Sequence, residues 1–283
     1  MNYSTLLVHL KLGVANDGLL KITGDLAERY DSAVIGVVAC KEASQIYLTM
    51  LPQYTVQGTD GDLVTIDRQL TDRMIREAER QFRAALQSRA SRLTWRSTVT
   101  SNSRSQYVAR QARAADLLIT SPVFDGPFVD QRQTLSVGDI VLYAGRPVLL
   151  VPPNIQSINF DTVMIGWKDT RESRRAVVDA LPLLSLAKRV VVVEIAATRD
   201  LPDAERHVAD VIGWLQRHGI AAETCVEAFA NAEKNQLKGI AQEIGAGLFV
   251  AGAYGHTRLR EWMIGGVTED LLLQPNRPTL ISH

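Results

Sequence analysis

Residues 247–273 read GLFVAGAYGHTRLREWMIGGVTEDLLL and carry the most informative pattern in the chain. The segment opens on the apolar run 248–251, which is too short for a helix and predicts a buried strand. A second apolar run, at 267–273, predicts a helix. Between the two runs lie a basic loop and a set of spaced glycines, which are Gly252, Gly255, Gly265 and Gly266.

This order of strand, glycine turn, loop and helix suits the binding of a phosphate. Glycine allows a positive φ and lets a ligand approach the backbone with no Cβ in the way. The first N–H groups of a helix have no partner inside it, and the helix dipole favours an anion there. Thr268 would add a hydroxyl in the first turn. Glycine-rich turns also occur for packing alone, so both interpretations stand at this point.

The rest of the chain alternates apolar runs with helical patterns, which predicts an α/β fold with a parallel sheet and helices on both faces. The first half predicts strands at 5–10, 33–39, 93–99, 116–120 and 148–151. Its helices are predicted at 66–93, at 105–115 and from a cap at Asn16 or Asp17 to Tyr30, with an insertion at 41–65. The second half predicts strands at 163–167, 189–195, 221–229, 248–251 and 279–282, and helices at 171–186, 202–218 and 231–244.

The second half repeats the first. A shift of 131 positions lays residues 248–251 on 117–120 and Arg277-Pro278 on Arg146-Pro147 without a gap, because 248 − 131 = 117 and 277 − 131 = 146. Such a register indicates an internal duplication. Pro152-Pro153 lies between the repeats, so we expect one domain at 1–153 and a second at 154–283.

The duplication provides an internal comparison for the glycine motif. The same shift places its four glycines on Ser121, Phe124, Thr134 and Leu135. Bulky side chains therefore occupy positions where a phosphate would approach the backbone. We expect the first domain to keep the fold and to have lost the phosphate site.

The pattern Gly-x2-Gly-x9-Gly after the fourth strand of a repeat resembles the nucleotide signature of the universal stress protein family. The words GAYGHTRLREWMIGGVTEDLL resemble that family throughout. The resemblance implies a tandem member with two domains, each a doubly wound five-stranded parallel sheet with helices on both faces. It also implies that the domains pair through their fifth strands within the chain, and it leaves a homodimer open.

The resemblance further implies a site for ATP or AMP in the second domain. Backbone N–H groups and the Thr268 hydroxyl would hold the phosphates, Mg²⁺ would bridge phosphate oxygens, and His256 could donate a hydrogen bond. Gly266 stands where nucleotide-binding members carry Ser or Thr, so one hydroxyl is missing. The backbone groups implied are those of Gly252, Gly255, Gly265, Gly266 and Val267.

The base side of that site is expected beyond the first two strands of the second domain. Family members carry an aspartate after the first strand, and here Lys168 takes its place with Asp169 one step later. Ile195 fits the apolar residue that the second strand supplies. Lys168 could turn toward phosphate or be a solvated lysine. The matching position in the first half is expected to be Leu10, which argues against a site there.

Composition narrows the class of function. Lys plus Arg (31) balances Asp plus Glu (31), so no net charge favours nucleic acid or an anionic membrane. No leader or membrane span is evident, and the two cysteines, Cys40 and Cys225, suit a reducing compartment, which predicts a cytoplasmic protein.

Catalytic patterns are missing from the sequence. The histidines show no metal-ligand spacing, and there is no nucleophile elbow, Walker lysine or dinucleotide motif. We therefore expect a stress-response or regulatory protein that binds nucleotide and is not an enzyme, with a regulatory protein partner. The alternatives are an interaction scaffold that binds no nucleotide, and a slow nucleotide hydrolase in which Asp169 or His256 activates water.

Overall fold

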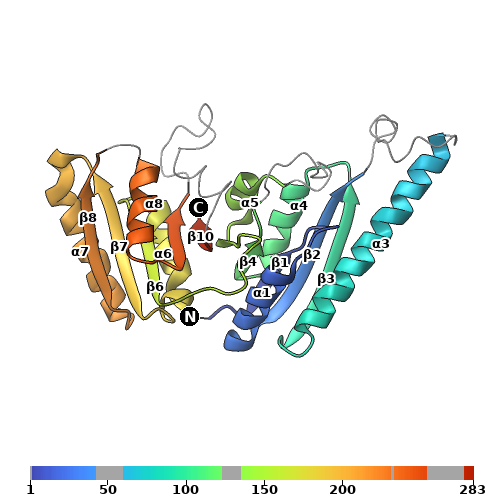
Figure 1. The fold of residues 1–283 in the computed structure, drawn as a ribbon, viewed down its shortest axis with the longest axis horizontal. Coiled ribbons are helices and arrows are strands. Elements are labelled where there is room, and N and C mark those ends of the chain that lie inside the picture. The colour runs from blue at the N-terminus through green and yellow to red at the C-terminus, as the bar shows by residue number, and fades with distance from the viewer. Residues whose placement is uncertain (1, 43–59, 123–134, 231–232, 254–276) are drawn as a thin grey trace.

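The structure, a computed structural model, describes residues 2–42, 60–122, 135–230, 233–253 and 277–283 (Figure 1). All ten predicted strands are present in them and form one continuous sheet. The strands are β1 (Thr5–His9), β2 (Ala33–Lys41), β3 (Arg92–Thr100), β4 (Leu117–Thr120), β5 (Val148–Leu150), β6 (Thr162–Gly166), β7 (Arg189–Ala196), β8 (Ala222–Ala228), β9 (Leu248–Gly252) and β10 (Thr279–Ser282).

The helices follow the predicted pattern with two differences. The long helix begins at Asp60 and ends at Leu86, earlier at both ends than predicted, and α5 was not predicted. The sequence of α5, VGDIVLYA, is too short and too apolar to display a helical period, and the helix starts where Ser136 accepts a hydrogen bond from the N–H of Asp139 at 3.1 Å. The helices are α1 (Asp17–Tyr30), α3 (Asp60–Leu86), α4 (Arg104–Gln111), α5 (Val137–Ala144), α6 (Arg171–Leu184), α7 (Leu201–Arg217) and α8 (Glu233–Glu243), with 3₁₀ turns at Ala112–Ala114 and Thr198–Asp200.

Two predictions at the helix ends need comment. Asn16 precedes α1 as predicted, but its side-chain amide bonds to the backbone of Lys11 and Val14 instead of capping the helix. Residues 60–65, predicted as part of an insertion, belong to α3, whereas 43–59 lie outside the described residues. The helix predicted at 267–273 also lies outside them.

The strand order reflects the duplication. It runs β3-β2-β1-β4-β5-β10-β9-β6-β7-β8, so each half contributes five strands in the same relative order. Neighbours within each half are parallel, and the fifth strands meet as the antiparallel pair β5–β10. Leu149 pairs with Leu280, its own counterpart at a shift of 131, which places the pseudo-twofold axis at this pair. The pairing that the resemblance implied is therefore present, and Figure 1 shows β10 between the two halves.

Helices cover both faces of the sheet. One apolar cluster joins α1 and α3 of the first half with α6 and α7 of the second. On the other face, α4 and α5 pack on the first half and α8 on the second. Tyr3 and Tyr30 add links between the halves, since their hydroxyls donate to the carbonyls of Asp179 and Pro182 on α6 at 2.5 and 2.7 Å. Among the described residues, no helix has the length and apolar character needed to cross a membrane.

Candidate functional site

The candidate site lies at the carboxyl ends of β6 and β9, which are neighbours in the sheet. The chain leaves β6 toward β7 and β8 on one side and later returns to β9 and β10 on the other. This reversal of strand order is where doubly wound sheets bind their ligands. Gly252 is the last residue of β9, so the glycine motif begins at this point. Its remaining predicted residues lie outside the described part of the chain, and they are Gly255, His256, Gly265, Gly266, Val267 and Thr268.

Lys168 follows β6 and reaches toward α8. Its Nζ atom lies 2.7 and 2.9 Å from the two carboxylate oxygens of Glu233, at the start of that helix. The Lys168 side chain is 42% exposed and that of Glu233 is 27% exposed. A pair with this exposure contributes at most about 1 kcal/mol to stability, so an anionic ligand could compete with Glu233 for the ammonium group.

Ile195 lies on the same face as α8. It is buried, and it belongs to the apolar cluster that includes Met164, Phe249 and, on α8, Ile240 and Ala241. The structure thus places Lys168 and Ile195 on one side of the sheet, and their assignment to the base side of a site stays a prediction.

Asp169 corrects that prediction, because it belongs to the other face. Its carboxylate accepts a hydrogen bond from Nη2 of Arg174 at 2.7 Å, and this bond holds the pKa of Asp169 below its usual value. Asp169 borders a groove between α6 and α7. Lys168 and Asp169 are consecutive residues beyond the strand end, where the chain turns into α6, so they diverge to opposite sides.

Gly252 is explained by helix packing. It does not have the positive φ that favours glycine. A Cβ atom here would lie 2.5 Å from the backbone carbon of Glu172 and 2.5 Å from the backbone nitrogen of Ser173, in the first turn of α6. Thr170 caps this turn by accepting a hydrogen bond from the N–H of Ser173 at 3.3 Å. The glycine therefore permits close contact between α6 and β9.

The sheet register corrects the comparison with the first half. Leu6 pairs with Leu117 in the first half and Val163 pairs with Leu248 in the second, so the two halves differ by 163 − 6 = 157 positions at these strands. The counterpart of Lys168 is consequently Lys11, and Leu10 corresponds to Trp167.

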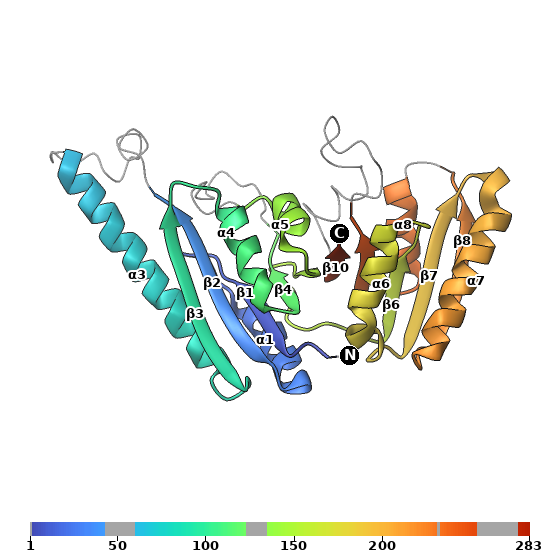
Figure 2. The same ribbon diagram turned by 180° about the vertical axis from the view of Figure 1, so that it is seen from behind.

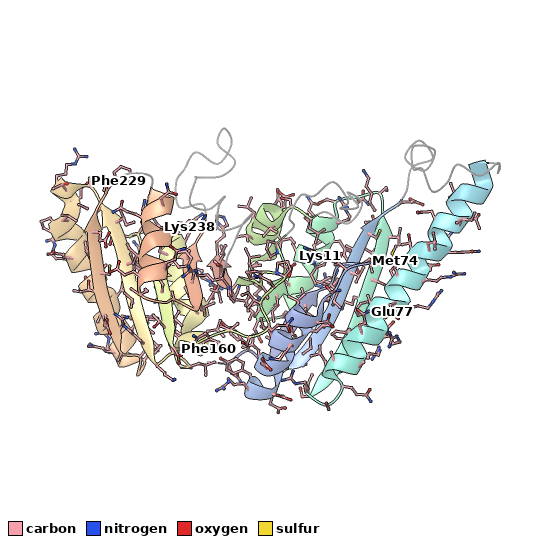
Figure 3. All side chains as sticks on the ribbon, viewed as in Figure 1. Lys11, Met74, Glu77, Phe160, Phe229 and Lys238 are labelled. Carbon is pink, nitrogen blue, oxygen red and sulfur yellow. The ribbon has the colours of Figure 1, made fainter. Side chains whose placement is uncertain are left out.

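Lys11, labelled in Figure 3, is held within its own domain. Its Nζ donates to the carbonyl of Pro122, just beyond β4, at 2.7 Å, and burial lowers the pKa of Lys11 to about 8. The lysine is thus present in both halves, but its contacts differ. In the first half it bonds to a backbone carbonyl, whereas Lys168 in the second half pairs with a carboxylate.

Three functional candidates were missed at the sequence level, and all concern the groove between α6 and α7. Among the described residues, buried polar atoms without a hydrogen-bond partner include Trp167 Nε1, Glu194 Oε2 and His207 Nδ1. Glu194 had a visible signal, since it is the one charged residue within the apolar run VVVVEI of β7. Trp167 and His207 had none, because aromatic residues near strand ends and on helices are usually packing or surface residues. No cluster of metal-ligating side chains occurs in the described ranges.

Comparison with known proteins identifies the fold. No family model matches the sequence, and no curated protein matches it either. A universal stress protein from Archaeoglobus fulgidus DSM 4304 superposes with a TM-score of 0.69 at 14% identity, over 98% of this chain and 95% of that one. A functionally unknown protein from Pseudomonas aeruginosa PAO1 gives 0.62 at 16% identity, over 99% and 92%. A provisionally named universal stress protein from Pseudomonas aeruginosa UCBPP-PA14 gives 0.62 at 16% identity, over 99% and 93%. The likeness therefore extends over both halves.

Proposed function

Given that the chain has the fold of a tandem universal stress protein, we propose that its second domain binds an adenine nucleotide, ATP or AMP, in a stress-response or regulatory role. The observation that carries this proposal is the position of the glycine motif. It begins at Gly252, where strand order reverses, beside the end of β6 that Lys168 follows and at the same end of the sheet as Ile195. A glycine-rich turn at this edge is a suitable place for phosphate.

The residues would have separate roles in that site. Lys168 would exchange its contact with Glu233 for one with a phosphate oxygen, and Ile195 would offer an apolar contact on the base side. Backbone N–H groups of the motif would bind the phosphates, and Mg²⁺ would bridge their oxygens. Asp169 is not included, because it pairs with Arg174 at the groove on the other face. The same ion pair weighs against Asp169 as the base of a hydrolase.

Isothermal titration with ATP and with AMP, each with and without Mg²⁺, tests the proposal. We expect one site per chain with micromolar affinity, lost in Gly255→Val. Lys168→Ala should weaken binding about tenfold, the effect of one charge-assisted hydrogen bond. Lys188→Ala is the matched control. Lys188 also forms an ion pair, with Asp161 at 2.7 Å, but it precedes β7 and so lies at the amino-terminal end of the strands, away from the proposed site. Equal losses in both lysine variants would contradict the assigned role of Lys168.

The number of sites tests the domain assignment. Two sites per chain would place a nucleotide in the first domain as well. So would a loss of binding in Lys11→Ala if Lys168→Ala bound as the wild type does. We expect one site, because the first domain carries Phe124 and Leu135 in place of motif glycines.

Two observations favour the scaffold as a second candidate. Lys168 is already paired with Glu233, and Gly266 lacks the hydroxyl that nucleotide-binding members carry. If neither ATP nor AMP produces heat or a thermal shift, the nucleotide proposal fails and a role in binding a protein partner takes its place.

A further inference from the structure

A groove of about 470 Å³ lies between α6 and α7, on the face of the sheet opposite α8. Figure 2 shows these two helices on the near side of β6 and β7. Trp167, Val177 and Val211 are buried at the groove, and Trp214 is half-buried along it. Charged side chains complete the lining, among them the Asp169–Arg174 ion pair. Both the volume and the mixture of apolar walls with a few polar groups are typical of small-molecule sites.

Polar atoms at this groove have no partner within the described residues. Trp167 is only 6% exposed and lines the groove, yet its Nε1–H has no acceptor in the described part of the chain. His207 also lines the groove, and its Nδ1 has no partner in the same part of the chain. Buried polar groups in proteins normally have a hydrogen-bond partner, because a buried donor or acceptor without a hydrogen bond lowers stability. Two unpartnered atoms on one hollow therefore point to a molecule that would satisfy them.

Glu194 adds a third such atom. It is 8% exposed, and it follows Val190 and Val192 at alternate positions of β7, which pack toward α6 and α7. Its Oε2 has no partner among the described residues. Its carboxyl group interacts electrostatically with His207 and Asp169, which both line the groove, and also with Lys168. A buried carboxylate oxygen without a hydrogen bond is unfavourable, so a donor near it would stabilise the charged form.

The first domain shows that the fold itself does not need these polar atoms. Leu10 and Trp167 are counterparts in the two domains. Their backbone N–H groups donate to the backbone carbonyls of Val37 and Val193, at 3.0 and 2.8 Å. The residue after Val37 is Val38, the counterpart of Glu194. Leu10 and Val38 are 0% and 1% exposed and purely aliphatic. One domain thus closes its core with hydrocarbon where the other carries an indole N–H and a carboxyl group.

We propose that the groove between α6 and α7 binds a small planar heteroaromatic molecule that carries both a hydrogen-bond acceptor and an N–H donor. Its acceptor meets Nε1–H of Trp167, its donor meets Glu194 or His207, and its ring packs between Trp167 and Trp214. Aromatic walls favour a flat partner through stacked or edge-on contacts. This site is separate from the proposed nucleotide site, since Lys168 and Ile195 lie on the other face.

Benzimidazole is a suitable probe, because it has one acceptor nitrogen and one N–H on a flat apolar body. Indole is the matched control ligand, with nearly the same shape and no acceptor nitrogen. Titration followed by calorimetry should give one benzimidazole site with submillimolar affinity, and indole should bind at least tenfold more weakly. Binding should survive in Gly255→Val, which separates this site from the proposed nucleotide site. Loss of benzimidazole binding in Gly255→Val would overturn the proposal.

Two variants test the location. Trp167→Phe removes the N–H and keeps an aromatic ring, and should weaken benzimidazole binding at least tenfold. Trp95→Phe is its control. Trp95 also has a buried Nε1 with no partner among the described residues, but it packs against Phe82 in the first domain, with ring centroids 5.4 Å apart. Val178→Trp fills the groove from a half-buried position on α6 and should abolish binding, with an unchanged thermal midpoint as evidence of folding. No binding to the wild type, or equal binding to the wild type and these two groove variants, would overturn the proposal.

Discussion

Replacing Gly252 with alanine separates two reasons for having glycine at this position. If the glycine serves helix packing, the change destabilises the protein with no ligand present. If it serves only a ligand, the empty protein tolerates the change. The new Cβ would lie 2.5 Å from two backbone atoms of α6, in Glu172 and Ser173, and 2.8 Å from the Glu172 carbonyl oxygen. These atoms belong to a helix backbone, so no flexible side chain can move aside.

The expected cost follows from the amount of displacement. Ordinary contacts of a Cβ atom begin at about 3.4 Å, so the start of α6 must move away from β9 by nearly one ångström. Overpacking of this kind costs about 1–3 kcal/mol. The upper part of this range is expected, because Glu172 and Ser173 are themselves buried and Thr170 caps the same turn. The thermal midpoint of Gly252→Ala should then fall by about 4–12 °C.

Thermal and urea unfolding without nucleotide, followed by circular dichroism, measure this effect. Gly239→Ala is the control, since Gly239 is exposed inside α8 and a Cβ there meets nothing within 4 Å. Alanine should leave that helix unchanged or stabilise it by about 0.5–1 kcal/mol. If Gly252→Ala unfolds within about 0.5 kcal/mol of the wild type, the packing explanation is wrong and the approach of a ligand becomes the reason for this glycine.

Three further predictions concern the core and its titrating groups. His9 is 3% exposed, and burial, aided by the charge of Lys11, lowers its pKa to about 3. As the pH falls, the unfolded chain therefore takes up a proton at His9 before the folded chain does. The free energy of unfolding of the wild type should fall by about 2 kcal/mol between pH 7 and pH 5. Urea titrations at both pH values should show that His9→Gln removes this loss. Leu280→Ala, at the fully buried centre of the β5–β10 pair, should cost about 2–5 kcal/mol in urea unfolding. Glu194→Gln should stabilise the protein at neutral pH and lose this advantage on acidification, because burial raises the pKa of Glu194 and the charged form is the unfavourable one.

Each of these has a control or a contradicting result. His218→Gln, at an exposed position, should leave the loss between pH 7 and pH 5 as it is in the wild type. Leu70→Ala is the control for Leu280→Ala. Leu70 is 40% exposed, so its replacement should change the free energy of unfolding by less than about 0.5 kcal/mol. If Leu280→Ala costs no more than Leu70→Ala, Leu280 does not lie at the centre of the interface. A Glu194→Gln variant that is less stable than the wild type at pH 7 would show that the carboxylate has a partner in solution.

The sequence predicted the central strands well because most of them are short apolar runs that are buried on both faces, whereas the edge strands β3 and β8 are more polar and partly exposed. Such runs as VVVV in β7 need no knowledge of their neighbours to be recognised. The ungapped shift of 131 positions likewise reported a real symmetry, in which Leu149 meets its own counterpart Leu280. The helix α5 escaped prediction because eight residues with an apolar majority carry too little periodic signal. Its start depends on the side chain of Ser136 as a cap.

The site shows where the sequence by itself stops being sufficient. The sequence located the end of the sheet at which Lys168, Ile195 and Gly252 lie, because parallel strands end on one side and the chain order reverses there. Only the tertiary structure decided the face that each residue belongs to. Beyond a strand end the alternation of side chains is lost, and the direction then depends on how α6 begins. This is why Asp169 turns to Arg174 while Lys168 turns to Glu233. Contacts between distant segments also decided that Gly252 accommodates α6 and that Trp167, Glu194 and His207 gather at one groove. Proximity of this kind is set by packing between segments that are far apart in the chain, so it leaves no local pattern.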